Sequence, residues 1–137
     1  MDTKKLITAW IASFIVMFSL SGLWYMVLMP EYYSVQFADV ERTEPLFTWI
    51  VLGYLVVSFL LAYIYPFGFK GNSPMKEGLR FGFIMGLIIA LPLGLIFYGV
   101  HTIPLSATLI DTIYMVVEKT IGGVVIGFVY GSSAKVE

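Results

Sequence analysis

Four long apolar stretches constrain this chain more than any other feature. They cover about residues 6–29, 46–65, 79–100 and 108–130, with polar segments between them. A helix rises about 1.5 Å per residue, so about 20 apolar residues cross the roughly 30 Å hydrocarbon core of a bilayer. Hydrophobic residues make up 59% of the chain and charged residues only 12%. The sequence therefore predicts an all-α membrane protein, with four transmembrane helices forming a single domain over residues 1–137.

The polar segments predict how these helices are connected and oriented. Short connections favour antiparallel neighbours, so we expect an up-down bundle of two antiparallel hairpins. Only Arg42 lies in the loops on one side, whereas the remaining loop and terminal basic residues fall on the other: Lys4, Lys5, Lys70, Lys76, Arg80 and Lys135. Because cytoplasmic loops carry an excess of lysine and arginine, we expect cytoplasmic N- and C-termini. The predicted location is the cell membrane, specifically the inner membrane of a bacterium.

Two adjacent charged residues, Glu118 and Lys119, interrupt the fourth apolar stretch. Residues 120–130 are uncharged, which places Lys119 near the middle of the bilayer. A charge at the centre of a transmembrane helix costs about 2.5–3.5 kcal/mol on insertion scales, so such residues face protein or water. Adjacent helical residues do not face each other. We therefore expect the two residues to face different neighbours, unless their long side chains bend together.

Three interpretations of this charged pair remain open from the sequence. The pair either serves packing and helix insertion, or belongs to an ion, proton or ligand pathway, or receives a charge from a partner subunit. Asp111 lies seven residues before Glu118, on nearly the same helical face. With Tyr114 and His101 it forms the candidate pathway.

Small residues predict where two of the helices pack. They recur at helical spacing in the third and fourth stretches: Gly82, Gly86, Ala90, Gly94, Gly123 and Gly127. Such spacing allows two helix backbones to approach closely. We expect the third and fourth helices to pack tightly, although these faces would also suit contact with another copy of the chain. Pro92 is expected to kink the third helix.

The polar segment over residues 30–45 is expected to be an interfacial loop or short surface helix, or a lid over an opening between helices. Tyr54 and Ser58 are polar positions inside the second apolar stretch, and we expect both to bond locally.

Several classes of site and function are not predicted. The chain has no cysteine, which excludes disulfides and thiolate ligands. His101 is the only histidine, and no spacing of ligands around it predicts a metal site. The sequence contains no nucleophile elbow or zinc-protease motif, so we predict no catalytic residue and no cofactor. No basic cluster of the kind that binds nucleic acid is present.

Two segments resemble a known family. The stretches GLWYMVLMPEYYSVQF (22–37) and GLRFGFIMGLIIALP (78–92) resemble a bacterial family of small four-helix integral membrane proteins of unknown function. The resemblance implies a four-helix membrane fold and transfers no catalytic residues.

The expected function is that of a non-catalytic accessory or self-associating membrane component with a buried Glu118/Lys119 pair. The alternative is a small proton- or ion-coupled transporter or channel that uses Glu118. The expected partners are the lipid bilayer and either further copies of the chain or a larger membrane complex.

Overall fold

The computed structural model describes residues 1–131, so the basic position Lys135 lies outside the described residues. All secondary structure within this range is helical, in the order α1 (Thr3–Gly22), η1 (Leu23–Leu28), α2 (Pro30–Gln36), α3 (Phe47–Ile64), η2 (Tyr65–Gly68), α4 (Pro74–Val100) and α5 (Leu105–Tyr130). Four helical segments in this part of the chain are long and apolar enough to cross a membrane: Thr3–Leu28, Phe47–Gly68, Pro74–Val100 and Leu105–Tyr130. The prediction of an all-α chain with four such helices is confirmed.

Local chemistry explains why three helices begin earlier than expected from their apolar residues. α1 begins at Thr3 rather than residue 6, because the side chain of Asp2 accepts hydrogen bonds from the first turn. α4 begins at Pro74 rather than residue 79, since proline is well suited to the first position of a helix. α5 begins at Leu105 rather than residue 108, directly after Pro104.

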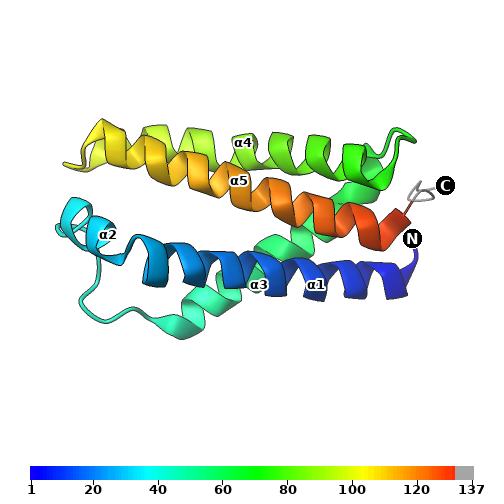
Figure 1. Cartoon of the computed structure of the whole chain (residues 1–137), viewed down its shortest axis with the longest axis horizontal. Helices are drawn as coiled ribbons and strands as arrows, with labels where there is room; N and C mark the ends of the chain where they lie inside the picture. Colours follow the sequence, from blue (N-terminus) through cyan, green and yellow to red (C-terminus); the bar gives the residue numbers. More distant parts are fainter. Residues whose placement is uncertain (132–137) are drawn as a thin grey trace.

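Helix α5 lies at the centre of the arrangement. α4 runs beside it, α1 lies on its other side, and α3 crosses obliquely behind α1 (Figure 1). Half of the residues in the most apolar 18-residue stretch of α5 are buried within the chain, whereas the buried share is 11 to 22% in the corresponding stretches of the other three helical segments. The interior is therefore organised around α5, while much of the apolar surface of the other helices faces outward.

Helices α4 and α5 approach each other closely along their glycines. A Cβ atom added to Gly82 would lie 2.5 Å from the carbonyl oxygen of Lys119, and one added to Gly123 would lie 2.5 Å from Cα of Gly82. For Gly86 and Gly127, backbone atoms of the opposite helix lie within 3.0 Å of the same position. A Cβ atom does not fit at the distances found for Gly82, Gly123 and Gly127, so these positions require glycine, whereas the 3.0 Å approach at Gly86 is tight.

The rest of the predicted stripe also faces α5. Ala90 is buried, and Gly94 lies against the side chain of Thr112 in α5. These small-residue faces are thus occupied within one chain rather than by another copy. Pro92 lies on the exposed side of α4, and the helix continues through it from Pro74 to Val100.

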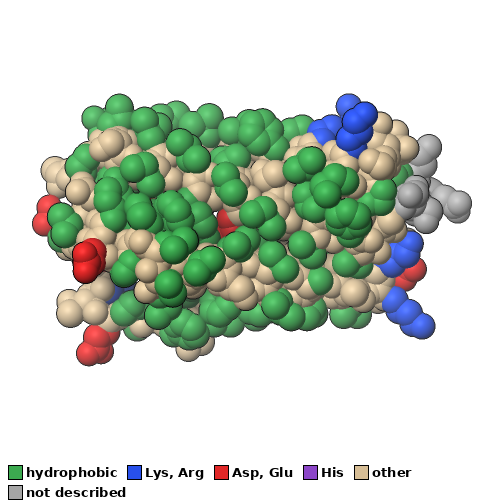
Figure 2. Space-filling view, viewed as in Figure 1, with side chains coloured by type: hydrophobic (Ala, Val, Ile, Leu, Met, Phe, Trp, Pro, Cys, Tyr) green, Lys and Arg blue, Asp and Glu red, His purple; other side chains and the backbone are tan. Residues whose placement is uncertain are grey.

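The two ends of the bundle carry opposite charges. Lysine and arginine gather at the end where α1 begins, acidic side chains gather mainly at the opposite end, and a largely hydrophobic surface lies between them (Figure 2). At the basic end, the ammonium of Lys5 donates to the carbonyl of Tyr130 over 2.9 Å, and the phenol of Tyr130 donates to the carbonyl of Ala62 over 2.9 Å. These bonds connect the start of α1, the end of α5 and the end of α3.

Candidate functional site

The charged pair of α5 lies inside the bundle. Glu118 is 1% exposed and Lys119 is 4% exposed. The two residues leave the helix toward different neighbours: a Cβ on Gly86 of α4 would contact the Cβ of Lys119, whereas Glu118 reaches α3. Their side chains nevertheless bend together, and the Lys119 ammonium forms an ion pair with Oε1 of Glu118. The pair is therefore neutral as a unit.

Two phenols satisfy the other oxygen of Glu118. Tyr54 of α3 donates to Oε2 over 3.0 Å, and Tyr114 of α5 donates to the same oxygen. The Lys119 ammonium lies 5.6 Å from the centroid of the Tyr54 ring, which adds a cation–π contact. Hydrogen bonds to a charged group are stronger than neutral ones. Lys119 and these phenols offset much of the cost of burying the carboxylate.

The expectation that Tyr54 and Ser58 both bond locally was correct for Ser58 only. The Ser58 hydroxyl donates to the carbonyl of Tyr54, one turn earlier, over 2.7 Å. The Tyr54 phenol instead reaches across the bundle to Glu118. A phenol extends well beyond its own helical turn, whereas a serine hydroxyl stays close to its own backbone.

A second carboxylate cluster surrounds Asp111. The phenols of Tyr25 and Tyr33 donate to Oδ1 of Asp111 over 2.7 and 2.9 Å. The Tyr33 oxygen also accepts a hydrogen bond from the indole of Trp24 over 2.8 Å. Burial raises the pKa of Tyr33 above its ordinary value, the indole hydrogen bond opposes this in part, and the Asp111 carboxylate raises it further. Tyr33 therefore keeps its proton and acts as a donor.

Tyr114 lies between the two carboxylate clusters. Its ring stacks on the Trp24 ring with centroids 4.9 Å apart, and it meets the Tyr25 ring edge-on with centroids 5.3 Å apart. Its hydroxyl is directed to Glu118. Asp111 and Glu118 are seven residues apart, about 10 Å along the axis of α5. Aromatic packing thus connects the clusters, while each carboxylate keeps its own set of phenol donors.

A cavity of about 470 Å³ adjoins the Asp111 cluster. It lies between η1, α2, the segment that follows α2, the C-terminal half of α4 and the N-terminal half of α5. Asp111 lines it, and Glu118 does not. A second cavity of about 390 Å³ lies between the end of α1, η1 and α5, and its lining is almost entirely apolar. The structure therefore separates an enclosed cluster at Glu118 from an accessible one at Asp111.

His101, the third member of the candidate pathway, lies apart from both clusters. Its ring packs on Phe97 with centroids 4.0 Å apart, and Nδ1 lies 3.0 Å from the carbonyl oxygen of the same residue. Among the described residues, no group of three or more histidine, aspartate or glutamate side chains is placed to hold a metal ion. The structure brings Asp111 and Tyr114 near Glu118 but leaves His101 out.

A second fully buried carboxylate, at the basic end of the bundle, was not predicted from the sequence. Glu77 is 0% exposed. Its Oε2 lies 2.6 Å from the guanidinium of Arg80, and its Oε1 accepts from the side chain of Asn72 over 2.7 Å. Backbone N–H groups of Lys70 and Asn72 also donate to Oε1 over 3.2 Å. Glu77 therefore organises the connection between α3 and α4.

Tyr25 and Tyr33 were also missed as partners of Asp111. The available signal was the concentration of aromatic residues after the first apolar stretch, but aromatic residues also mark membrane interfaces. Composition alone does not distinguish aromatic residues at a membrane interface from aromatic residues that donate hydrogen bonds to a carboxylate.

Comparisons with known proteins give no match: no family model, no curated protein and no solved structure corresponds to this chain. The resemblance to small four-helix bacterial membrane proteins therefore remains a prediction.

Proposed function

We propose that the chain is an integral protein of the bacterial inner membrane that crosses the bilayer four times with both termini in the cytoplasm. Its helices would form an up-down bundle of two antiparallel hairpins, α1 with α3 and α4 with α5. The support is the set of four apolar helices and the concentration of basic side chains at one end of the bundle. The positive-inside rule assigns that end to the cytoplasm.

The absence of native cysteine allows a direct test of this topology. Ser34 in α2 and Ser73 before α4 are exposed at opposite ends, and both change conservatively to cysteine. A membrane-impermeant maleimide should label Ser34→Cys in intact spheroplasts and Ser73→Cys only after permeabilisation. The reverse labelling pattern would contradict the proposed orientation.

Within the membrane, we propose that the protein acts as a non-catalytic component whose charged pair is structural. The observation that carries this proposal is the complete enclosure of Glu118 by Lys119, Tyr54 and Tyr114. A residue that relays protons or ions needs access to water or to a polar cavity. Glu118 lines neither of the two cavities described above.

An accessory or self-associating role also requires a surface for partners. The glycine faces of α4 and α5 are used within the chain, so self-association would involve other faces. Large apolar side chains are exposed along the outer faces of α3 and α4, including Trp49, Val56, Ile88 and Ile96. These surfaces suit lipid and neighbouring membrane helices.

Proton flux distinguishes this role from ion-coupled transport through Glu118. The protein is reconstituted into proteoliposomes with a trapped pH-sensitive dye, and a pH gradient is imposed. We expect wild type and Glu118→Gln to dissipate the gradient at the same rate, equal to that of empty liposomes. A flux present in wild type and in the exposed control Glu31→Gln, but lost in a Glu118→Gln variant that far-UV circular dichroism shows to be folded, would overturn the structural role in favour of ion coupling.

A further inference from the structure

The cavity beside Asp111 has the dimensions and lining of a binding site. Its volume of about 470 Å³ falls in the range of about 300–1,000 Å³ typical of small-molecule pockets. Such pockets combine a mainly apolar or aromatic wall with a few convergent polar groups. This cavity is walled by the rings of Tyr25, Tyr33, Phe37 and Phe97 together with the Asp111 carboxylate.

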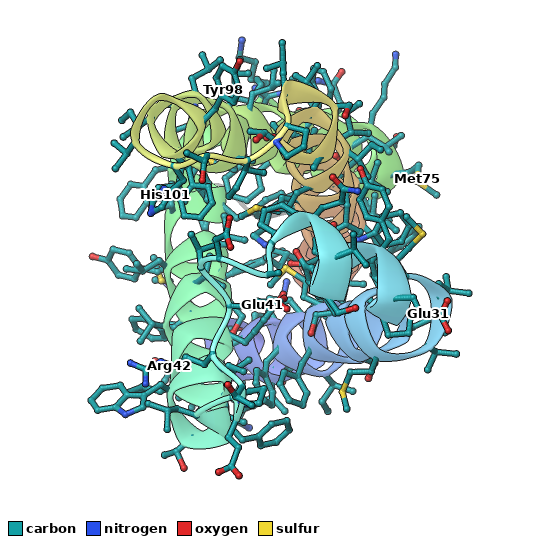
Figure 3. The ribbon with its side chains drawn as sticks, turned by 90° about the vertical axis from the view of Figure 1, so that its left-hand side faces the viewer. Glu31, Glu41, Arg42, Met75, Tyr98 and His101 are labelled. Carbon is teal, nitrogen blue, oxygen red and sulfur yellow. The ribbon has the colours of Figure 1, made fainter. Side chains whose placement is uncertain are left out.

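The charges of the cavity have a single sign. Asp111 lies on its inner side and the exposed Glu41 at its rim, while no lysine, arginine or histidine lines it among the described residues. Seen from the acidic end of the bundle, Glu41 lies near the centre, between α2 and α3, whereas Glu31 points away at the edge (Figure 3). This charge distribution favours a cation and disfavours an anion.

The Asp111 carboxylate retains capacity for a ligand. Tyr25 and Tyr33 both donate to Oδ1, and Oδ2 accepts no hydrogen bond from the described residues. The two phenols fix the orientation of the carboxylate. An ionised carboxylate with a free oxygen is a strong partner for an ammonium group.

The surrounding rings decide which kind of cation fits. A metal ion would require several oxygen or nitrogen ligands, and the described residues provide no group of three acidic or histidine side chains here. Aromatic faces attract ammonium groups and also accommodate an apolar body. The hydroxyls of Thr108 and Thr112 add weaker acceptors on the α5 side.

We propose that this cavity binds a monovalent organic cation, with its ammonium group against Asp111 and its apolar body among the aromatic rings. The segment from Phe37 to Glu41, which follows α2, forms part of the wall and the rim. This segment matches the lid that the sequence analysis considered for residues 30–45. The inference is independent of the structural role of Glu118, because Glu118 does not line the cavity.

A matched pair of probes tests the proposal. Benzyltrimethylammonium carries the required charge on an aromatic body, and neopentylbenzene has the same shape with carbon in place of nitrogen. Binding is measured by isothermal titration of the full chain in nanodiscs of zwitterionic lipid, with empty nanodiscs subtracted. We expect saturable binding of the ammonium probe and no competition from the neutral probe. Equal binding of the two probes, or no saturable binding of either, would overturn the proposal.

Single substitutions test whether the ammonium probe binds beside Asp111. Asp111→Asn should weaken binding of benzyltrimethylammonium by at least about tenfold, because it removes the charge that pairs with the ammonium. Glu31→Gln, which removes an exposed acid outside the cavity, should bind as wild type does. Folding is checked by size-exclusion elution and far-UV circular dichroism. If Asp111→Asn does not fold, Glu41→Gln at the exposed rim replaces it, with a severalfold weakening expected. Unchanged affinity in a folded Asp111→Asn variant, or in Glu41→Gln where it serves as the replacement, would refute this location.

Discussion

Replacing Glu118 by glutamine should destabilise the bundle strongly, because it leaves the Lys119 ammonium buried without its counter-charge. Lys119 is 4% exposed, so solvent cannot take over the role of the carboxylate. Removing one partner of a buried ion pair costs about 3–5 kcal/mol. The hydrogen bonds agree with this range: the bonds from Tyr54 and Tyr114 now reach a neutral acceptor, which weakens each by about 1 kcal/mol, and the ammonium loses its ion pair.

Removing the lysine instead of the glutamate should cost less folding free energy. Lys119→Met leaves the Glu118 carboxylate with both phenol donors in place, and we expect a loss of about 1–3 kcal/mol. The double variant Glu118→Gln/Lys119→Met carries no charge at this pair. Apolar or neutral replacement of a whole buried pair is often nearly neutral, so its stability should lie within about 1.5 kcal/mol of wild type.

Reversible unfolding in mixed micelles with increasing SDS measures these free energies, with far-UV circular dichroism as the readout. Wild type, the two single variants and the double variant form a double-mutant cycle whose coupling energy isolates the pair. Glu31→Gln serves as the exposed control and should change stability by less than about 0.5 kcal/mol. A Glu118→Gln variant as stable as wild type, or a double variant no more stable than that single variant, would refute the structural role of the pair.

Three further predictions concern other contacts, each measured by the same unfolding titration unless stated. Gly123→Ala should destabilise the fold by several kcal/mol, because its Cβ would overlap the backbone of α4. The control Gly53→Ala, which has open space around it, should be neutral or stabilise by up to about 1 kcal/mol. Equal effects of the two substitutions would contradict the close helix contact. Tyr54→Phe removes a hydrogen bond to a carboxylate and should cost about 1.5–3 kcal/mol, while the partly exposed Tyr63→Phe should be silent. Glu77→Gln should loosen the connection before α4, and limited proteolysis there should accelerate relative to wild type; unchanged cleavage would argue against its organising role.

The contact between α4 and α5 is readable from the sequence because glycine at helical spacing has few other uses inside an apolar stretch. Gly82 and Gly123 have no side chain that could serve another function, so close helix packing is the main explanation for them. The same reasoning located a buried charge at Lys119, since an uncharged stretch follows it on the way to the end of the helix. The spacing of glycines and the position of a charge can each be read within one helix, so a single sequence is enough to predict them.

The partners of the Glu118 and Asp111 carboxylates could not be predicted in this way. Tyr54 reaches Glu118 from another helix, and Tyr33 reaches Asp111 from α2. These contacts depend on the crossing of α3 and on how the chain turns back after η1. A tyrosine in an apolar stretch satisfies its hydroxyl locally, at an interface or across the bundle, and only the relative placement of helices selects among these. Glu77 was overlooked because an acid near a helix start is commonly solvated.

The central position of α5 has a consequence for biosynthesis. The chain is made from its N-terminus, so in the proposed membrane topology α1, α3 and α4 enter the bilayer before α5, against which α1 and α4 pack. Until then, the phenols of Tyr25 and Tyr54 face lipid or temporary partners. In this topology, α5 brings Glu118 together with Lys119 and Tyr114 into a membrane that already holds Tyr54, the remaining donor to the carboxylate. The hairpin of α1 and α3 forms without α5, but α4 gains its main packing partner only with α5, so fragments ending before Leu105 should be targets for membrane quality control.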